Sequence, residues 1–163
     1  MSVCERLLAV HAVAALVAYA GAMTSPDIAF STIVRDNRER FQPLRRELGV
    51  SSFGMNLIVL QPGQRGRIHA HEHQEEVFLV LEGRLTLLVE GVEHVLGPDR
   101  LVRIGAPVRR QLVNAGEQRL VLLALGGSGE HAGRDGQAWI AWEDHGPGRP
   151  PQDVQLPDDL PAA

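Results

Sequence analysis

Residues 51–127 consist of short apolar runs separated by turn residues, and this pattern constrains the fold more than any other feature of the chain. The runs are rich in Val, Leu and Ile, recur about every eight to twelve residues and show no helical periodicity. Glu90-Gly91 is typical of a hairpin turn between two of them. We therefore predict an all-β sandwich or barrel, with strands near residues 53–60, 67–71, 76–83, 84–91, 92–97, 100–105, 108–114 and 119–127.

The segments on either side lack this pattern. Residues 26–50 form a lead-in, and within it Pro43 breaks any long helix, so we expect a solvated flap with a short helical turn. Residues 128–163 form an irregular C-terminal extension, and the proline and acid content of residues 146–163 predicts an unpacked tail. A chain of 163 residues has room for one domain of average size.

Residues 1–25 are excluded from the predicted fold. The run 7–22 is almost entirely apolar, too short for a comfortable membrane span but of the length of a signal-peptide core. The flanking charges cancel and His11 interrupts the run, which argues against export, and Met23 is an alternative start of translation. We expect no stable membrane insertion and a cytoplasmic protein, with export as the alternative if residues 1–22 are a genuine signal peptide.

Charge and cysteine content narrow the classes of partner. The formal net charge is −4 and no Lys/Arg block stands out, so no nucleic-acid partner is expected. Cys4 is the only cysteine, which rules out an intrachain disulfide and is compatible with a reducing compartment. The partner that we expect is a small-molecule ligand inside the barrel.

Two histidines and a glutamate carry the chemistry that the sequence offers. His69 and His71 are two residues apart on a predicted strand, so both imidazoles project from one face. Glu76 begins the next strand, where its carboxylate can meet them across the neighbouring strand. Alternation favours it over Glu75, because Glu76 shares its face with Phe78. This set suits a divalent transition metal (Fe, Mn, Ni, Cu or Zn) with positions left open for water or substrate.

The spacing of these residues resembles the first motif of the cupin superfamily. The match runs Gly63, five residues, His69, one residue, His71, four residues, Glu76, six residues, Gly83. The resemblance covers residues 52–126 and implies a double-stranded β-helix, the jelly-roll barrel, with a pocket inside. It also implies that the two histidines and Glu76 bind a metal, together with a further histidine from a second motif.

The second motif departs from the family pattern. Asn114 falls where the family has asparagine, but Arg110 stands where the fourth metal ligand would be, and an arginine cannot bind a metal. In one alternative, Arg110 pairs with an anionic group of a substrate beside the metal; in the other, it pairs with Glu76 in a metal-free pocket. His73, in the loop that follows His71, is either a solvent-exposed residue or a replacement ligand.

Two hypotheses of different class follow. In the first, the chain is a metal-dependent small-molecule cupin that binds its substrate through Arg110, Phe78 and Asn114 and performs oxygenation, decarboxylation or isomerisation. In the second, it is a metal-free, non-catalytic binding or sensing barrel with a Glu76–Arg110 ion pair. No catalytic residue is assigned. A homodimer is expected, because small barrels with exposed strand edges commonly pair with a copy of themselves.

Overall fold

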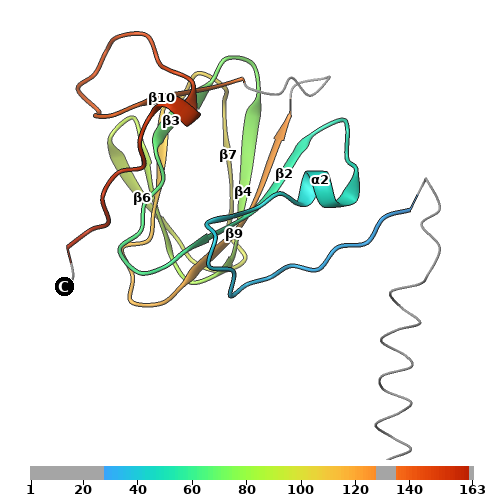
Figure 1. Ribbon diagram of the computed structural model, residues 1–163. Coiled ribbons are helices and arrows are strands. Elements are labelled where there is room, and N and C mark those ends of the chain that lie inside the picture. Colours follow the sequence, from blue (N-terminus) through green and yellow to red (C-terminus); the bar gives the residue numbers. More distant parts are fainter. Residues whose placement is uncertain (1–27, 128–134, 162–163) are drawn as a thin grey trace, which may run out of the picture. The chain divides into compact units, whose positions relative to one another are not determined.

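Two five-stranded antiparallel sheets face each other in the computed structural model, which describes residues 28–127 and 135–161 (Figure 1). Residues 28–30 belong to a separate N-terminal unit, and the barrel lies in residues 31–161. One sheet has the order β1-β2-β9-β4-β7, with β1 Phe41–Gln42, β2 Gly54–Leu60, β9 Leu120–Gly127, β4 Glu75–Glu82 and β7 Leu101–Ile104. The other has the order β10-β3-β8-β5-β6, with β10 Gly136–Trp139, β3 Ile68–His71, β8 Arg110–Val113, β5 Leu85–Val89 and β6 Val92–Leu96. The all-β jelly-roll fold is confirmed.

An apolar cluster fills the interior between the two sheets. In β2, side chains alternate, so that Ile58 and Leu60 point into the barrel while Leu57 and Val59 pack on its outer side. Burying one such side chain contributes about 1.5–3 kcal/mol relative to leaving it exposed. The interior cluster comprises Ile58, Leu60, Phe78, Val80, Leu85, Leu87, Ile104, Leu112, Leu120, Leu122 and Ala124.

The hairpin between β5 and β6 has the turn that the sequence predicts. Glu90 has φ 47° and Gly91 has φ 80°, so both central residues are in the left-handed region, as a type I′ turn requires. This turn matches the right-handed twist of the two strands, and they pair from Val89↔Val92 to Leu85↔Leu96.

The lead-in covers the outer face of the first sheet. The helical turn is α2, Leu44–Leu48, which follows Pro43 and ends at Gly49 with φ 67°. Leu44 is 2% exposed, because it packs against the outward side chains of β2 and β9. The segment is therefore not the solvated flap that we expected, although the short helical turn is present.

The C-terminal extension also packs against the barrel. β10 pairs with β3, and a 3-10 turn, η1 (Pro151–Asp153), follows. Val154 is 1% exposed, and the backbone NH of Leu160 donates to the carbonyl oxygen of Gly63 at 2.7 Å. The expectation of an unpacked tail is wrong for residues 146–160. A proline-rich segment needs no core of its own when a few buried apolar side chains and backbone hydrogen bonds hold it to a barrel.

Two other expectations concern the ends and edges of the fold. The apolar run 7–22 lies outside the described residues. Within the ranges that the structure describes, no helix combines the length and apolarity needed to cross a bilayer.

β6 and β7 each end one of the sheets, and Val92, Val95 and Leu101 on them are more than half exposed (62%, 54% and 63%). The homodimer stays a prediction.

Candidate functional site

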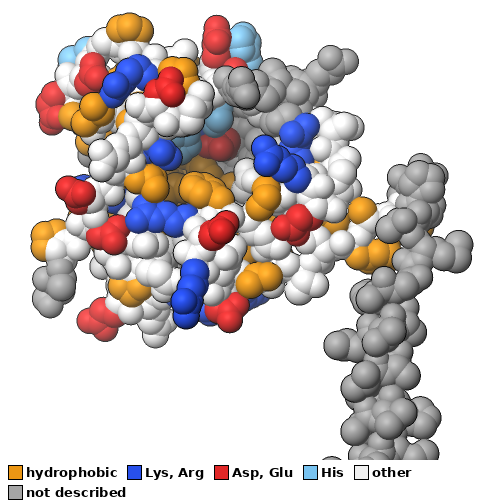
Figure 2. Space-filling view, in the orientation of Figure 1, with side chains coloured by type: hydrophobic (Ala, Val, Ile, Leu, Met, Phe, Trp, Pro, Cys, Tyr) orange, Lys and Arg blue, Asp and Glu red, His pale blue; other side chains and the backbone are white. Residues whose placement is uncertain are grey.

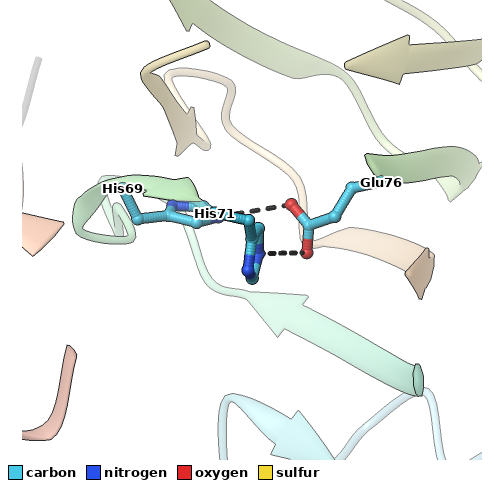
Figure 3. A group of neighbouring side chains, drawn as sticks. All are labelled: His69, His71 and Glu76. Atoms are coloured by element: carbon cyan, nitrogen blue, oxygen red, sulfur yellow. Dashed lines mark hydrogen bonds and ion pairs between the residues drawn. The ribbon is translucent and has the colours of Figure 1, made fainter. Parts of the chain in front are cut away.

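His69 and His71 lie on β3 and point into the space between the two sheets (Figure 3). Ile68 and Ala70, which alternate with them, are buried on the opposite face. The two imidazole rings are nearly perpendicular, at 89°, and their centroids are 5.8 Å apart. A four-residue strand is therefore enough to present both imidazoles at one place.

Glu76 reaches these imidazoles from the other sheet. Its Oε2 lies 3.4 Å from His69 Nε2, and its Oε1 lies 3.3 Å from His71 Nε2 (Figure 3). Glu75 points the other way and pairs with Arg103 on the surface. The sequence suggested a meeting across neighbouring strands, but β3 and β4 belong to facing sheets. The triad of His69, His71 and Glu76 thus spans the interior and depends on how the barrel closes.

The outer nitrogens of both imidazoles face hydrogen-bond acceptors. His69 Nδ1 lies 3.1 Å from the carbonyl oxygen of Arg67, which only accepts, so the proton is assigned to Nδ1. His71 Nδ1 lies 3.6 Å from a carboxylate oxygen of Asp135, whose side chain is 3% exposed. That distance is beyond a hydrogen bond, but Asp135 is the acceptor that a proton on this nitrogen would face. In the tautomer protonated at Nδ1, Nε2 of each imidazole keeps its lone pair, directed at Glu76.

Arg110 occupies the interior beside the triad. It lies on β8 opposite His69, and its side chain is fully buried. Nε and Nη2 donate to Glu76 Oε2 at 3.2 and 2.7 Å, and Nη1 donates to the carbonyl oxygens of Ala106 and Val108 at 3.2 and 2.8 Å. Each guanidinium nitrogen thus donates to the protein, and an ion pair joins Arg110 to Glu76.

The surroundings of Glu76 keep its carboxyl group ionised. Burial alone would raise its pKa, but hydrogen bonds from His69 and His71 when their Nε2 atoms are protonated, together with the charges of protonated His69 and of Arg110, lower that pKa well below its usual range. Glu76 is therefore a poor proton acceptor near neutral pH and a good anionic ligand.

A cavity of about 350 Å³ opens beside the triad. Figure 2 shows a hollow whose depth is hydrophobic, with histidine and acidic side chains at one end and basic side chains at its edge. Among the described lining residues, only Arg40 and Arg67 are charged apart from Glu76 and the histidines. Such a volume suits a small molecule. The apolar walls include Phe41, Ile58, Leu60, Phe78, Leu112 and Leu156.

The other residues that the sequence suggested for substrate binding lie in different places. Phe78 lines the cavity and is 1% exposed. Asn114 is fully buried, and its amide donates to the carbonyl oxygens of Leu60 and Gln118 at 2.9 and 2.8 Å. Neither Asn114 nor Arg110 belongs to the described lining of the cavity. Both hold the barrel together around it.

The triad fits a divalent metal ion. His69, His71 and Glu76 each offer a ligand atom, and these atoms lie within 4.8 Å of one another. Two atoms that are each about 2.0–2.2 Å from one ion lie roughly 3 to 3.6 Å apart. The separations of 3.3 Å from His71 Nε2 to Oε1 and of 3.4 Å from His69 Nε2 to Oε2 fall in that range, and they involve the two different oxygens of the carboxylate. Imidazole nitrogens with a carboxylate oxygen are the donor set of Fe, Mn, Ni, Cu and Zn sites.

A second group of potential ligands lies on the outer side of His71. Glu72, His73 and Asp135 also bring ligand atoms within 4.8 Å of one another. Asp135, however, accepts hydrogen bonds from the backbone NH groups of His73 and Gln74 at 3.0 and 2.8 Å, and His73 is 64% exposed. Burial would raise the pKa of Asp135, but these bonds and the charge of His71 lower it. The group is best explained as the anchor of the loop between β3 and β4.

Sequence reasoning missed two residues that shape the site. Arg67 precedes β3, and the alternation that groups His69 with His71 puts position 67 on the same face, so a signal for it existed. Asp135 lies far along the chain, just before β10, and nothing in its local sequence indicates that it approaches His71.

Comparison with known families agrees with this geometry. The family model described as "Cupin domain" matches residues 56–126, which run from β2 to β9 and include the triad and Arg110. Residues 56–126 form a cupin domain. The lead-in and the C-terminal extension add walls to the cavity of this domain.

Three individual proteins that resemble this chain share at most about a third of the aligned residues with it. The polyketide synthase CurC of Streptomyces cyaneus is 32% identical over 90 residues, which cover 52% of this chain and 58% of the relative. The chain thus spans little more than half the length of this relative. A sugar phosphate isomerase of the cupin superfamily from Silicibacter pomeroyi is 26% identical, with a TM-score of 0.56 over 70% of this chain and 76% of that one. A cupin protein from Bacteroides fragilis, 17% identical, has a TM-score of 0.54 over 82% of this chain and 100% of its own, and shares the fold.

Proposed function

We propose that this cupin binds a divalent transition metal through His69 Nε2, His71 Nε2 and Glu76 Oε1, and converts a small molecule held in the adjoining cavity. The observation that carries the proposal is the direction of the two imidazoles. Their outer Nδ1 atoms face acceptors, so the tautomer with both protons on Nδ1 directs both Nε2 lone pairs at a carboxylate.

Lone pairs directed at a carboxylate repel it unless positive charge lies between them. Two protons can supply that charge, if both imidazoles become imidazolium, or one divalent cation can. A cation is the better candidate, because one divalent ion supplies the positive charge that otherwise needs two protons and uses all three side chains as ligands. The triad therefore has the chemistry of a metal site, with Fe, Mn, Ni, Cu and Zn as the candidate ions.

Arg110 is compatible with this role. It contacts only Oε2 of Glu76, so Oε1 keeps its lone pairs for a metal. Its two hydrogen bonds fix the carboxylate as a one-oxygen ligand and neutralise its second oxygen. The same ion pair also supports the alternative, a metal-free binding barrel in which Arg110 neutralises Glu76 permanently.

The cavity lining favours chemistry that takes place at the metal. A bound metal supplies Lewis-acid or redox chemistry. Outside the triad, the described lining contains arginines, one asparagine and apolar residues, none of which is a general base. This favours oxygenation or decarboxylation over an isomerisation that needs a protein base, although one structural relative is a sugar phosphate isomerase.

Elemental analysis of the full chain, purified without a metal-binding tag, tests the proposal. We expect about one metal per chain in the parent, loss of that metal in His71→Ala, and no loss in His94→Ala, because His94 is exposed on β6. Metal absent from the parent, or unchanged in His71→Ala, contradicts the proposal and leaves the metal-free binding barrel with its Glu76–Arg110 pair.

A further inference from the structure

We propose that Arg67 binds the acidic group of the cavity's ligand, and that the ligand is a small, largely apolar or aromatic carboxylate. The carboxylate lies at Arg67, the apolar body lies against the inner walls of the barrel, and the far end faces the triad. Only the placement of this far end rests on the proposed metal site. The sequence suggested Arg110 as the residue that recognises an anion, and we assign this role to Arg67 instead, because Arg67 lines the cavity and Arg110 does not.

Arg67 is held in place but not neutralised. Its Nε donates to the carbonyl oxygen of Val154 in the C-terminal extension, which fixes the side chain along the cavity wall. In the described part of the chain, no carboxylate lies within ion-pair distance of it. The other arginine of the lining, Arg40, already pairs with Asp159 at 3.1 Å. Arg67 thus offers both terminal nitrogens of its guanidinium to a ligand.

The electrostatic setting of Arg67 favours an anion. Arg67 and Arg40 line the same cavity, so two cations lie along its wall, and within the described residues only Arg40 of the two is paired with a carboxylate. An anion placed between the cavity and Arg67 relieves this repulsion, most strongly where apolar walls reduce the screening by water.

The position of Arg67 sets the length of the ligand. Arg67, His69 and His71 share one face of the extended segment, and side chains two residues apart on such a face are separated by about 7 Å. A ligand that pairs with Arg67 and reaches the triad therefore has a body of about one or two fused rings between its two ends.

The walls of the cavity decide between an apolar and a hydroxyl-rich anion. Asn56 is the only neutral polar side chain in the described lining, whose other members are mainly apolar. Most hydroxyl groups of a sugar phosphate would lose water there without finding a partner, which disfavours binding. An aromatic carboxylate buries its rings against the walls and needs only one charged partner.

Calorimetric titration of the full chain with 2-naphthoate tests this assignment. Arg67→Met keeps the side-chain volume and removes the charge, and we expect it to weaken 2-naphthoate binding roughly 10- to 100-fold, the value of a charged hydrogen-bonded contact. Arg65→Met is the matched control. Arg65 also donates its Nε to a carbonyl oxygen of the C-terminal extension, that of Asp158, but does not line the cavity, so its loss should change binding less than about twofold.

Three further measurements make the test specific for charge and for ligand class. Arg67→Lys, which keeps a cation, should bind 2-naphthoate more tightly than Arg67→Met does, even if both variants are less stable than the parent. The neutral 2-naphthamide should bind parent and Arg67→Met equally, and glucose 6-phosphate should bind the parent more weakly than 2-naphthoate. Unchanged 2-naphthoate binding by Arg67→Met, equal binding by the lysine and methionine variants, or preference for the sugar phosphate overturns the assignment.

The metal content of the same samples separates this assignment from the proposed function. Arg67→Met should keep the metal of the parent. A metal-free parent whose 2-naphthoate binding still depends on Arg67 contradicts the metal proposal and supports the anion site. A metal-containing parent whose binding ignores Arg67 contradicts the anion site alone.

Discussion

Two arginine–glutamate pairs lie at opposite ends of β4 and have nearly the same geometry. Arg110 donates Nε and Nη2 to one oxygen of Glu76 at 3.2 and 2.7 Å, and Arg119 donates Nε and Nη2 to one oxygen of Glu82 at 3.1 and 2.7 Å. Their surroundings differ. The side chains of the first pair are 0% and 16% exposed, and those of the second are 31% and 35% exposed.

The comparison shows that burial, rather than hydrogen-bond geometry, determines what such a pair does. The charges of Arg119 and Glu82 keep much of their hydration, so either residue can lose its partner at little cost. The Arg110 side chain is fully buried, so water cannot stabilise its charge if Glu76 is lost. The stability of the barrel therefore depends on Glu76 as the counter-ion of Arg110. Glu76 thus has two roles: it neutralises Arg110, and it is a member of the triad.

Replacing each arginine by alanine should give the largest difference in stability between the two pairs. Arg110→Ala leaves Glu76 without its main counter-ion and opens a cavity, and we expect the free energy of unfolding to fall by about 3–5 kcal/mol. Arg119→Ala should lower it by only about 0.2–1 kcal/mol. Urea denaturation of both variants, monitored by circular dichroism, measures the difference. Equal losses would show that burial does not separate the pairs.

Acid stability should show a smaller contrast. The folded-state pKa of Glu76 lies below that of the unfolded chain, so this carboxylate stabilises the fold fully above the unfolded value of about 4.3, and the contribution is lost as pH falls through the folded value. In chelator-treated protein, the free energy of unfolding of the parent should fall at pH values below about 4.3 as Glu76 is protonated. Glu76→Gln has no carboxylate at this position, so its free energy of unfolding should fall less over the same pH range.

Glu82→Gln is the matched control for that experiment, because it removes a more exposed carboxylate from the same strand, and it should change the acid dependence less than Glu76→Gln does. Urea midpoints measured from about pH 5 to about pH 3 give the slope for each variant. A Glu76→Gln slope that equals the parent slope would show that this carboxylate does not contribute to acid unfolding.

Salt should produce the smallest contrast. The Debye length falls from about 10 Å at 0.1 M salt to about 3 Å at 1 M, which screens exposed charges but not buried ones. The small stability loss in Arg119→Ala should therefore approach zero at about 1 M sodium chloride, whereas the loss in Arg110→Ala should persist. Repeating the urea titrations at both salt concentrations checks this, and a loss in Arg110→Ala that also disappears would mean that water reaches its guanidinium.

The strand pattern and the turn between β5 and β6 were predictable from the sequence, because both are local. A strand repeats every two residues, so the face shared by His69 and His71 follows from their spacing alone. A turn with two positive φ values needs residues that tolerate them, which Glu90-Gly91 supplies. β10 was missed, since its four residues carry no alternating pattern and form a strand only because β3 offers an edge.

The sequence by itself therefore determined the all-β class, the strands from β2 to β9 and the three candidate ligands. Only the tertiary structure decided that Glu76 meets the histidines from the facing sheet, that Arg110 is bound by the protein, and that Arg67 has no carboxylate partner within the described residues. The reason is physical: alternation sets the direction of a side chain over a few residues, but its partners depend on how distant strands close the barrel.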